Sequence, residues 1–190
     1  IRRDIKPGNV ILCKRGGLLD VAKVLDFGLV KELEGQDDLS RASELTGTPL
    51  YLSPEAITRP SEVDHRSDIY ALGAVGFFLL TGDHVFTGET IVEICSHHLH
   101  SAVPLASSRV AGVPRDLEGV IRDCLAKDPD ARPESASELL ERLEECDYVS
   151  DWTQADARAW WDTHQGEIDA LKQAFSSMET ELDIDLQRRG

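Results

Sequence analysis

Near its start the chain alternates between short apolar runs and a polar turn, and it then becomes polar for a long stretch. Residues 10–12 are apolar, 14–17 are polar with two glycines, and 21–25 again place apolar side chains at alternate positions. This pattern predicts two short strands joined in a β-hairpin. Residues 30–48 are polar and aperiodic, which predicts a long loop. Long loops inside compact domains are usually functional.

Beyond residue 54 the apolar positions recur at the spacing of α-helices. The apolar run 69–80 ends at Thr81-Gly82, where glycine suits a helix C-cap, so it predicts a buried helix. Three amphipathic stretches predict further helices, over 90–99, 116–127 and 135–145. In the last of these, four side chains are expected to face inward: Ala136, Leu139, Leu140 and Leu143. The predicted fold class is therefore mainly α with a small β-hairpin at its start.

The composition changes at about residue 147, which divides the chain into a domain over 1–146 and an acidic helical extension over 147–190. All three tryptophans lie in this extension, and no proline does. Apolar residues recur there at spacings of three and four, the pattern of a helix that packs against another helix: Ile168, Leu171, Phe175, Met178 and Leu182. A tail helix docked on its own domain is favoured over self-association of two chains through 168–182. Packing of Trp160 and Trp161 on the domain is likewise favoured over an exposed partner patch.

The charge of the chain narrows the classes of partner. Its 35 acidic and 20 basic residues give a net charge of -15, which disfavours nucleic acid and anionic membrane surfaces as partners. The run 69–80 is shorter than the roughly 20 residues of a membrane-spanning helix, and no signal peptide is visible. The cysteines form no CxxC pair, so buried inert thiols in a reducing cytoplasm are the favoured interpretation.

Five short motifs follow one another in a recognisable order. They are IRRDIKPGNV at 1–10, DFG at 26–28, GTPLYLSPE at 47–55, RSDIYALG at 66–73 and DPDARP at 128–133. In this order and spacing the chain resembles the C-terminal lobe of eukaryotic-type protein kinases, and its wording is similar to the Ser/Thr kinases of bacteria. The resemblance covers 1–146 and implies a kinase fold that is α+β in its complete form.

The resemblance implies a site for phosphoryl transfer from ATP to a Ser/Thr hydroxyl of a protein substrate. Such a site positions the hydroxyl and neutralises the transferred phosphoryl group with cations. Asp4 matches the catalytic-loop aspartate, and Lys6 matches the lysine that reaches the transferred phosphate. Asn9 and Asp26 match the ligands of Mg²⁺, a hard ion that prefers oxygen. Thr48 matches the threonine that contacts the catalytic aspartate and lysine below the peptide-binding site.

Three further residues match structural positions of the family. Glu55 and Arg132 match a buried ion pair that fixes the far end of the activation loop. Removing one partner of a buried pair leaves an uncompensated charge, at a cost of roughly 3–5 kcal/mol. Asp68 matches the aspartate at the start of the buried helix, which holds the catalytic-loop backbone from below.

The polar loop before Glu55 carries Ser40, Ser43 and Thr46, which we predict to be regulatory phosphorylation sites. Arg3 resembles the arginine that binds an activation-loop phosphate, so autophosphorylation would order this loop. A solvated loop rich in hydroxyl groups is the alternative.

Two features depart from the family pattern. Arg2 stands where the family usually has histidine, below the DFG turn. In addition, nothing in the sequence matches the N-terminal lobe: there is no Gly-rich phosphate-covering loop, no strand lysine and no helix glutamate. We therefore expect the chain to be the downstream piece of a longer kinase and to be inactive when isolated. A non-catalytic docking module with a kinase-like lobe is the alternative.

A cluster of potential metal ligands lies near residue 97, formed by Cys95, His97, His98 and His100. These residues lack the i, i+4 histidine pair of a helical zinc site. The segment that follows resembles the ordinary linker after a helix of the kinase lobe, so this interpretation is favoured over metal binding.

Overall fold

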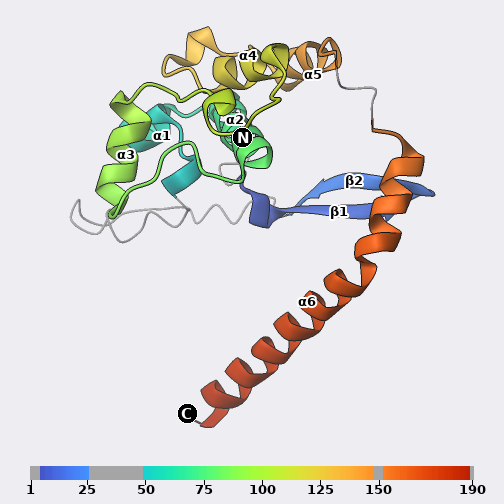
Figure 1. Cartoon of the computed structure of the whole chain (residues 1–190). Helices are drawn as coiled ribbons and strands as arrows, with labels where there is room; N and C mark the ends of the chain where they lie inside the picture. Colours follow the sequence, from blue (N-terminus) through green and yellow to red (C-terminus); the bar gives the residue numbers. More distant parts are fainter. Residues whose placement is uncertain (1–4, 26–48, 148–151, 189–190) are drawn as a thin grey trace. The chain divides into compact units, whose positions relative to one another are not determined.

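The computed structural model describes residues 5–25, 49–147 and 152–188, with side chains in the last segment up to 171 and at 173. The chain divides into two compact units, which are described separately. Residues 1–12 and 22–150 form a helical unit, and residues 13–21 and 151–190 form a hairpin–tail unit. The helices of the first unit are α1 (Pro54–Thr58), α2 (His65–Thr81), α3 (Ile91–His100), α4 (Arg115–Cys124) and α5 (Ala136–Glu144) (Figure 1).

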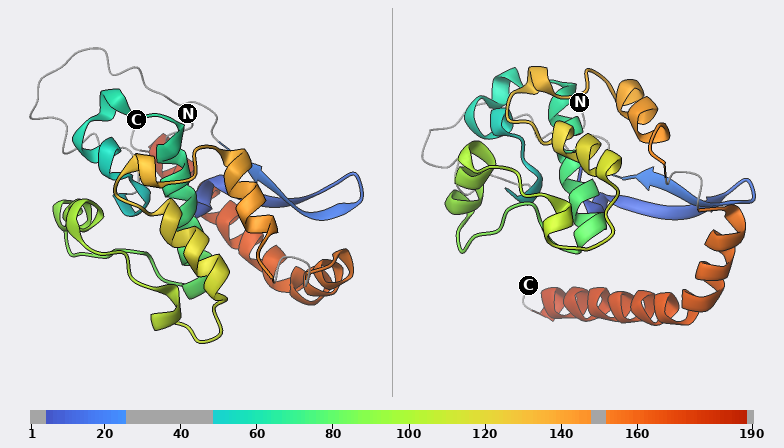
Figure 2. Two further views of the ribbon diagram at one scale, coloured as in Figure 1. Left: turned by 90° about the horizontal axis from the view of Figure 1, so that it is seen from above. Right: turned by 45° about the horizontal axis from the view of Figure 1, so that its top comes forward.

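Helix α2 forms the centre of the helical unit. It begins after the N-cap Asp64, earlier than the apolar pattern predicted, and it ends at Gly82, whose φ of 75° confirms the predicted C-cap. Helix α4 packs along α2 (Figure 2), and this close approach depends on Gly73. A Cβ atom at Gly73 would lie 2.7 Å from the Cβ of Cys124, so any larger residue would push the two helices apart.

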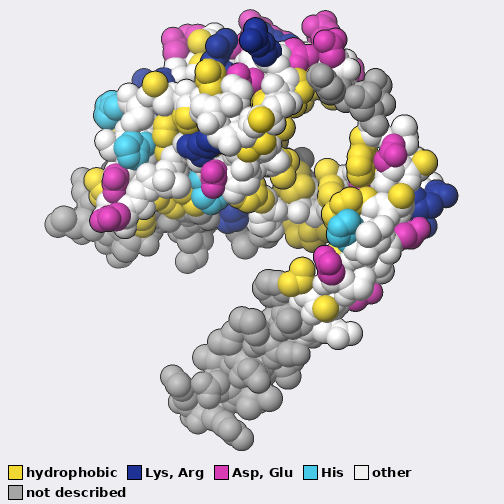
Figure 3. All heavy atoms as spheres, viewed as in Figure 1, with side chains coloured by type: hydrophobic (Ala, Val, Ile, Leu, Met, Phe, Trp, Pro, Cys, Tyr) yellow, Lys and Arg dark blue, Asp and Glu magenta, His cyan; other side chains and the backbone are white. Residues whose placement is uncertain are grey.

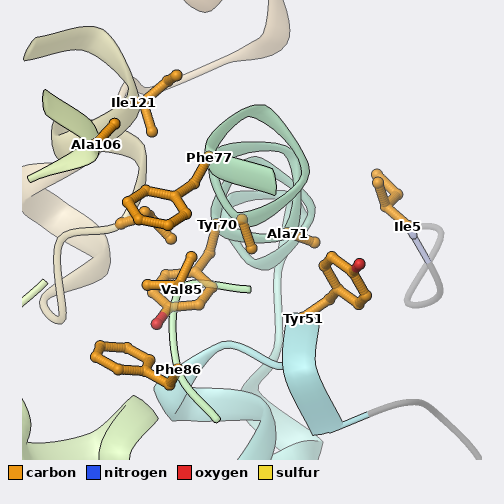
Figure 4. Packing of buried hydrophobic residues seen from close by; sticks show 11 residues of the cluster. Ile5, Tyr51, Tyr70, Ala71, Phe77, Val85, Phe86, Ala106 and Ile121 are labelled. Carbon is orange, nitrogen blue, oxygen red and sulfur yellow. The ribbon is translucent and has the colours of Figure 1, made fainter. Parts of the chain in front are cut away.

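The main hydrophobic core extends from the start of the chain to α4. Buried side chains of α2 contact those of the segment that follows it, including Tyr70, Phe77, Val85 and Phe86. The same cluster includes Ile5 and Tyr51, which Figure 4 shows together near Ala71 at one end of the core. The core therefore joins the start of the chain to the segment around residue 50.

The other predicted helices are confirmed, with corrections to α4 and α5. Thr90 and Ser135 cap α3 and α5 with their side-chain oxygens, as polar residues at helix starts commonly do. Helix α4 ends at Cys124, three residues earlier than predicted, because the backbone at Leu125 leaves the helical region. The expectation that Leu140 faces inward was wrong, since it is 55% exposed. The apolar packing of α5 against α4 comes from the stripe that contains Leu139 and Leu143.

Leu140 is not alone in this, because Ala136 is also exposed. Both residues lie beside the stripe that carries Leu139 and Leu143, and α5 contacts the core through that stripe alone. An amphipathic pattern identifies the buried side of a helix, but it does not fix how wide that side is.

A two-stranded antiparallel sheet follows the first described residues, as predicted. Strands β1 (Val10–Arg15) and β2 (Leu18–Val24) are longer than the predicted runs and are joined by Gly16 and Gly17, both with positive φ. Glycine adopts this conformation without steric cost, which explains the turn. Asp20 also has a positive φ, of 58°, which is unusual for a residue with a side chain.

Strand β2 contacts the beginning of the tail within the hairpin–tail unit, through Leu19 and Asp20. Trp152 Nε1–H donates to Asp20 Oδ2 at 2.8 Å, and Trp161 Nε1–H donates to Asp20 Oδ1 at 2.7 Å. The side-chain amide of Gln154 accepts from the Leu19 N–H at 2.8 Å and donates to the Leu19 carbonyl at 3.3 Å. One carboxylate thus accepts hydrogen bonds from two indole groups, and these two bonds hold the side chain of Asp20 in place.

The tail itself forms the long helix α6 (Gln154–Arg188). Trp160 is 43% exposed and its ring stacks on His164 at a centroid distance of 4.4 Å. Leu171 is exposed, and the side chains of Phe175, Met178 and Leu182 lie outside those described, so the role of the apolar repeat stays a prediction. None of the helices in the described residues is both long and apolar enough to cross a membrane.

The buried His98 makes the stability of the helical unit depend on pH. Its Nδ1 lies 2.8 Å from the Tyr70 hydroxyl, and burial, followed by the charge of Lys127, lowers the pKa of His98 from 6.5 to about 4. In the unfolded chain His98 is therefore protonated below pH 6.5, whereas in the folded chain it stays neutral down to about pH 4. The free energy of unfolding has its full value, as far as His98 is concerned, above pH 6.5. It falls progressively as the pH is lowered from 6.5 to about 4, because protonation of His98 then favours the unfolded chain.

We expect this titration to cost about 3 kcal/mol of unfolding free energy between those two pH values. The variant His98→Asn keeps a polar partner for Tyr70 but does not titrate. In urea unfolding at about pH 7 and about pH 4.5, the wild type should lose more stability than the variant does. An equal loss in both proteins would exclude His98 as the source.

Candidate active site

The segment that leads into β1 carries the first described residues of the predicted site. Lys6 is extended, with φ −157° and ψ 159°, and it precedes the 3-10 helix η1 (Pro7–Asn9). Pro7 suits the first position of this turn because no N–H is needed there. The Asn9 N–H donates to the Lys6 carbonyl at 3.0 Å, and the Asn9 side chain is buried. The backbone thereby places Lys6 and Asn9 on one tight turn.

The end of β2 is joined to this turn. The Leu25 N–H donates to the Asn9 carbonyl at 2.7 Å. Leu25 directly precedes Asp26 in the sequence, and Asp26 itself lies outside the described residues. The hydrogen bond joins the two ends of the β1–β2 hairpin, which lie next to the predicted oxygen ligands Asn9 and Asp26 in the sequence.

Many of the predicted site residues lie outside the described parts of the chain. They are Arg3, Asp4, Asp26, Ser40, Ser43, Thr46 and Thr48. Their roles stay predictions. The structure places Lys6, Asn9, Glu55, Asp68 and Arg132.

The segment after Thr48 is held by the core. It forms the 3-10 helix η2 (Pro49–Tyr51), in which Tyr51 is buried, and burial raises the pKa of its hydroxyl. Ile5, which lies between Asp4 and Lys6 in the sequence, belongs to the same buried cluster (Figure 4). The two segments that border the predicted catalytic and peptide positions are therefore packed into one core.

The structure brings Glu55 and Arg132 together as a buried ion pair. Arg132 Nη1 and Nη2 donate to the two carboxylate oxygens of Glu55 at 2.7 and 2.8 Å. The side chain of Arg132 is 0% exposed and that of Glu55 8%. Two parallel bonds of this kind give both strength and a fixed geometry.

The remaining donors of Arg132 are all used. Nε–H donates to the backbone carbonyl of Ala126 at 2.8 Å, Nη1–H to the backbone carbonyl of Arg66 at 2.9 Å and Nη2–H to the backbone carbonyl of Lys127 at 3.2 Å. The guanidinium also lies over the Tyr70 ring, 4.9 Å from its centroid. A buried charge is tolerated when it is paired and fully hydrogen-bonded, and Arg132 meets both conditions.

The electrostatics of Glu55 follow from its partners. Burial by itself would raise the pKa of Glu55, but the hydrogen bonds from Arg132 and Ser67 outweigh it and lower the pKa to about 2. The Ser67 hydroxyl donates to Glu55, and Ser53 in turn donates to Ser67 at 3.0 Å. Ser53 also caps α1, so the carboxylate, the cap and the first turn of α2 form one network.

Asp68 lies in the first turn of α2 and is half-buried. The helix begins after Asp64, whose carboxylate accepts the Arg66 N–H at 2.8 Å. The residue that starts the helix is therefore Asp64, and Asp68 lies inside it.

Lys127 is a residue that sequence reasoning missed. Its Nζ donates to the carbonyls of His98 at 2.7 Å and His97 at 3.4 Å, and it lies 4.5 Å from the centroid of the Phe86 ring. Burial, followed by the charge of Arg132, lowers the pKa of Lys127 to about 8. A cation is favourable at the C-terminal end of a helix, so Lys127 fixes the end of α3. Only its place before Asp128-Pro129 could have drawn attention to it.

The cysteine and histidine residues of α3 lie on different sides of the helix, some buried and some exposed. His98 is buried, whereas His97 is partly exposed and His100 is exposed; Figure 3 shows histidine side chains at the surface over α3. In the described parts of the chain, no group of three or more His, Cys, Asp or Glu residues is placed to hold a metal ion.

Comparison with known proteins adds an independent result. The family described as "Protein kinase domain" matches residues 1–143. The chain is 38% identical over 152 residues to serine/threonine-protein kinase pkn3 of Myxococcus xanthus, which covers 77% of this chain and 28% of that protein. It is 35% identical over 140 residues to serine/threonine-protein kinase PknB of Mycobacterium tuberculosis, with 73% of this chain and 22% of that protein covered. The chain thus spans about a quarter of the length of these relatives.

Proposed function

The chain belongs to the protein kinase family, and from this premise we propose that the protein transfers the γ-phosphoryl group of ATP to serine or threonine hydroxyls of a protein substrate. The names of its bacterial relatives support a Ser/Thr-specific activity. We infer further that the helical unit is the C-terminal lobe of the kinase domain. In that lobe the catalytic segment, the activation loop and the peptide-binding segment would follow one another along the chain.

In this proposal four side chains perform the chemistry. Asp4 orients the attacking hydroxyl and accepts its proton, and Lys6 neutralises charge on the transferred phosphoryl group. The amide oxygen of Asn9 and the carboxylate of Asp26 would hold Mg²⁺, for which such oxygen donors are suited. When bound, Mg²⁺ would neutralise the phosphate oxygens during transfer. Thr48 would contact Asp4 and Lys6 below the substrate.

The observation that carries this proposal is the 2.7 Å hydrogen bond from the Leu25 N–H to the Asn9 carbonyl. It brings the residue before Asp26 next to the residue that would share a magnesium ion with it. The pairing supports a common site because two residues that bind one ion must lie close together in space.

Radiolabelled ATP tests the proposal directly. The protein expressed from its complete coding sequence should transfer label to serine and threonine, but not tyrosine, in a mixture of protein substrates with Mg²⁺. The 190-residue chain alone should transfer none, because its sequence contains no Gly-rich loop or strand lysine for the ATP phosphates. Absence of transfer by the complete protein would favour a non-catalytic docking module.

We also propose that Ser40, Ser43 or Thr46 is autophosphorylated and that Arg3 binds the resulting phosphate. Mass spectrometry of the active protein after incubation with ATP should find phosphate on at least one of these residues. A fully active protein that stays unmodified over 26–48 would contradict this regulation.

A further inference from the structure

We propose that His84 is a positioning residue for the peptide-binding side of the active site, acting through Tyr51; this inference rests on the proposed kinase function. His84 lies in the connection between α2 and α3, far in sequence from every predicted catalytic residue. Three observations support it: an anchored backbone, a stacked ring and a contact to Tyr51.

The backbone is held in place at His84 and in the residues that follow it. Val85 and Phe86, which follow it, are buried in the main core. Arg109 Nη1–H donates to the His84 carbonyl at 2.7 Å, and its Nη2–H donates to the Val85 carbonyl at 3.2 Å. The same guanidinium lies 4.9 Å from the centroid of the Phe77 ring. His84 therefore has a fixed starting point from which its side chain extends.

The imidazole ring is fixed as well. It stacks on Phe78 with a centroid distance of 5.1 Å and an angle of 18° between the ring planes. Its Nδ1 lies 3.3 Å from the Tyr51 hydroxyl, and the two rings meet edge to face at 5.7 Å. His84 thus holds the polar end of a side chain whose ring lies in the core.

Tyr51 connects His84 to the predicted site. It lies three residues after Thr48, and it shares a buried cluster with Ile5, the residue between Asp4 and Lys6 (Figure 4). A rotation of the Tyr51 ring would disturb the packing of both segments. Reacting groups must be held within a fraction of an ångström for efficient transfer, so a support of this kind acts on the rate of the reaction.

Two variants of His84 separate the effect of ring stacking on Phe78 from that of the hydrogen bond to Tyr51. His84→Phe keeps a ring to stack on Phe78 but removes the hydrogen bond, whereas His84→Asn keeps a polar atom near the position of Nδ1. In the protein expressed from its complete coding sequence, we expect His84→Phe and Tyr51→Phe each to lower kcat by about fivefold, the effect of one lost hydrogen bond, with the KM for ATP nearly unchanged. His84→Asn should restore part of the loss, and the double variant His84→Phe/Tyr51→Phe should be no slower than either single one.

His100→Phe is the matched control, because His100 is exposed and lies outside this contact. Additive losses in the double variant, or no loss in either single variant, would overturn the proposal. A second readout does not need activity. In the 190-residue chain, amide hydrogen exchange of residues 5–9 and 49–53 should be faster in His84→Phe than in the control. Unchanged exchange would overturn the proposal whether or not the protein transfers phosphate. Faster exchange in a protein that transfers no phosphate would support the contact, and the absence of transfer would then count against the proposed function alone.

Discussion

Replacing Arg132 by methionine is expected to lower the free energy of unfolding of the helical unit by about 3–5 kcal/mol. The substitution keeps much of the side-chain volume but leaves the carboxylate of Glu55 buried without its partner. The carbonyls of Ala126, Arg66 and Lys127 would lose their donors at the same time. Urea unfolding followed by circular dichroism at neutral pH measures the change directly.

Two controls identify the buried charge as the cause. Arg59 pairs with Glu62 on the surface, where the two side chains are 62% and 61% exposed, so Arg59→Met should cost no more than about 1 kcal/mol. The double variant Glu55→Leu/Arg132→Met removes both charges and should be more stable than Arg132→Met alone. If Arg132→Met were no more harmful than Arg59→Met, the pair would have no structural role.

The second large effect is expected at the predicted catalytic aspartate. Asp4→Asn keeps the shape of the side chain but removes its ability to accept a proton. In the protein expressed from its complete coding sequence, we expect kcat for peptide phosphorylation to fall by about 10²–10⁴-fold. The affinity for Mg-ATP should stay nearly the same, because Asp4 is proposed to act on the hydroxyl of the substrate. Steady-state kinetics and nucleotide binding measured on the same preparation separate the two effects.

Asp162→Asn is the matched control for this variant, since Asp162 is an exposed residue of α6. Its kcat should equal that of the wild type. A similar loss in both variants would indicate a general effect on folding, and a fully active Asp4→Asn variant would exclude Asp4 as the catalytic residue.

Periodicity predicted α4 and α5 because each of them packs one apolar stripe against the core. The run that became α2 and the glycine that ends it were both readable, since a left-handed C-cap favours glycine. The sequence did not predict how wide the buried stripe of each helix is. Leu140 is exposed because α5 contacts its neighbour along a single stripe, and this depends on how the helix is placed.

The predicted pairing of Glu55 with Arg132 came from the resemblance alone. These residues are 77 positions apart, and no periodic pattern connects them. The same limit applies to contacts that the resemblance did not suggest. The bonds of Asp20 to two tryptophans, of Arg109 to the backbone at His84 and of His84 to Tyr51 each join distant segments. Such contacts arise from tertiary packing, so they required the structure.

A phosphate-transfer assay with three proteins decides whether the chain carries the catalytic residues of a Ser/Thr protein kinase. The protein from the complete coding sequence, its Asp4→Asn variant and its Asp162→Asn variant are each incubated with radiolabelled ATP, Mg²⁺ and a protein substrate. We expect label on serine or threonine with the wild type and Asp162→Asn, and almost none with Asp4→Asn. Equal labelling by all three proteins, or no labelling by any of them, would show that Asp4 is not the catalytic residue of such a kinase.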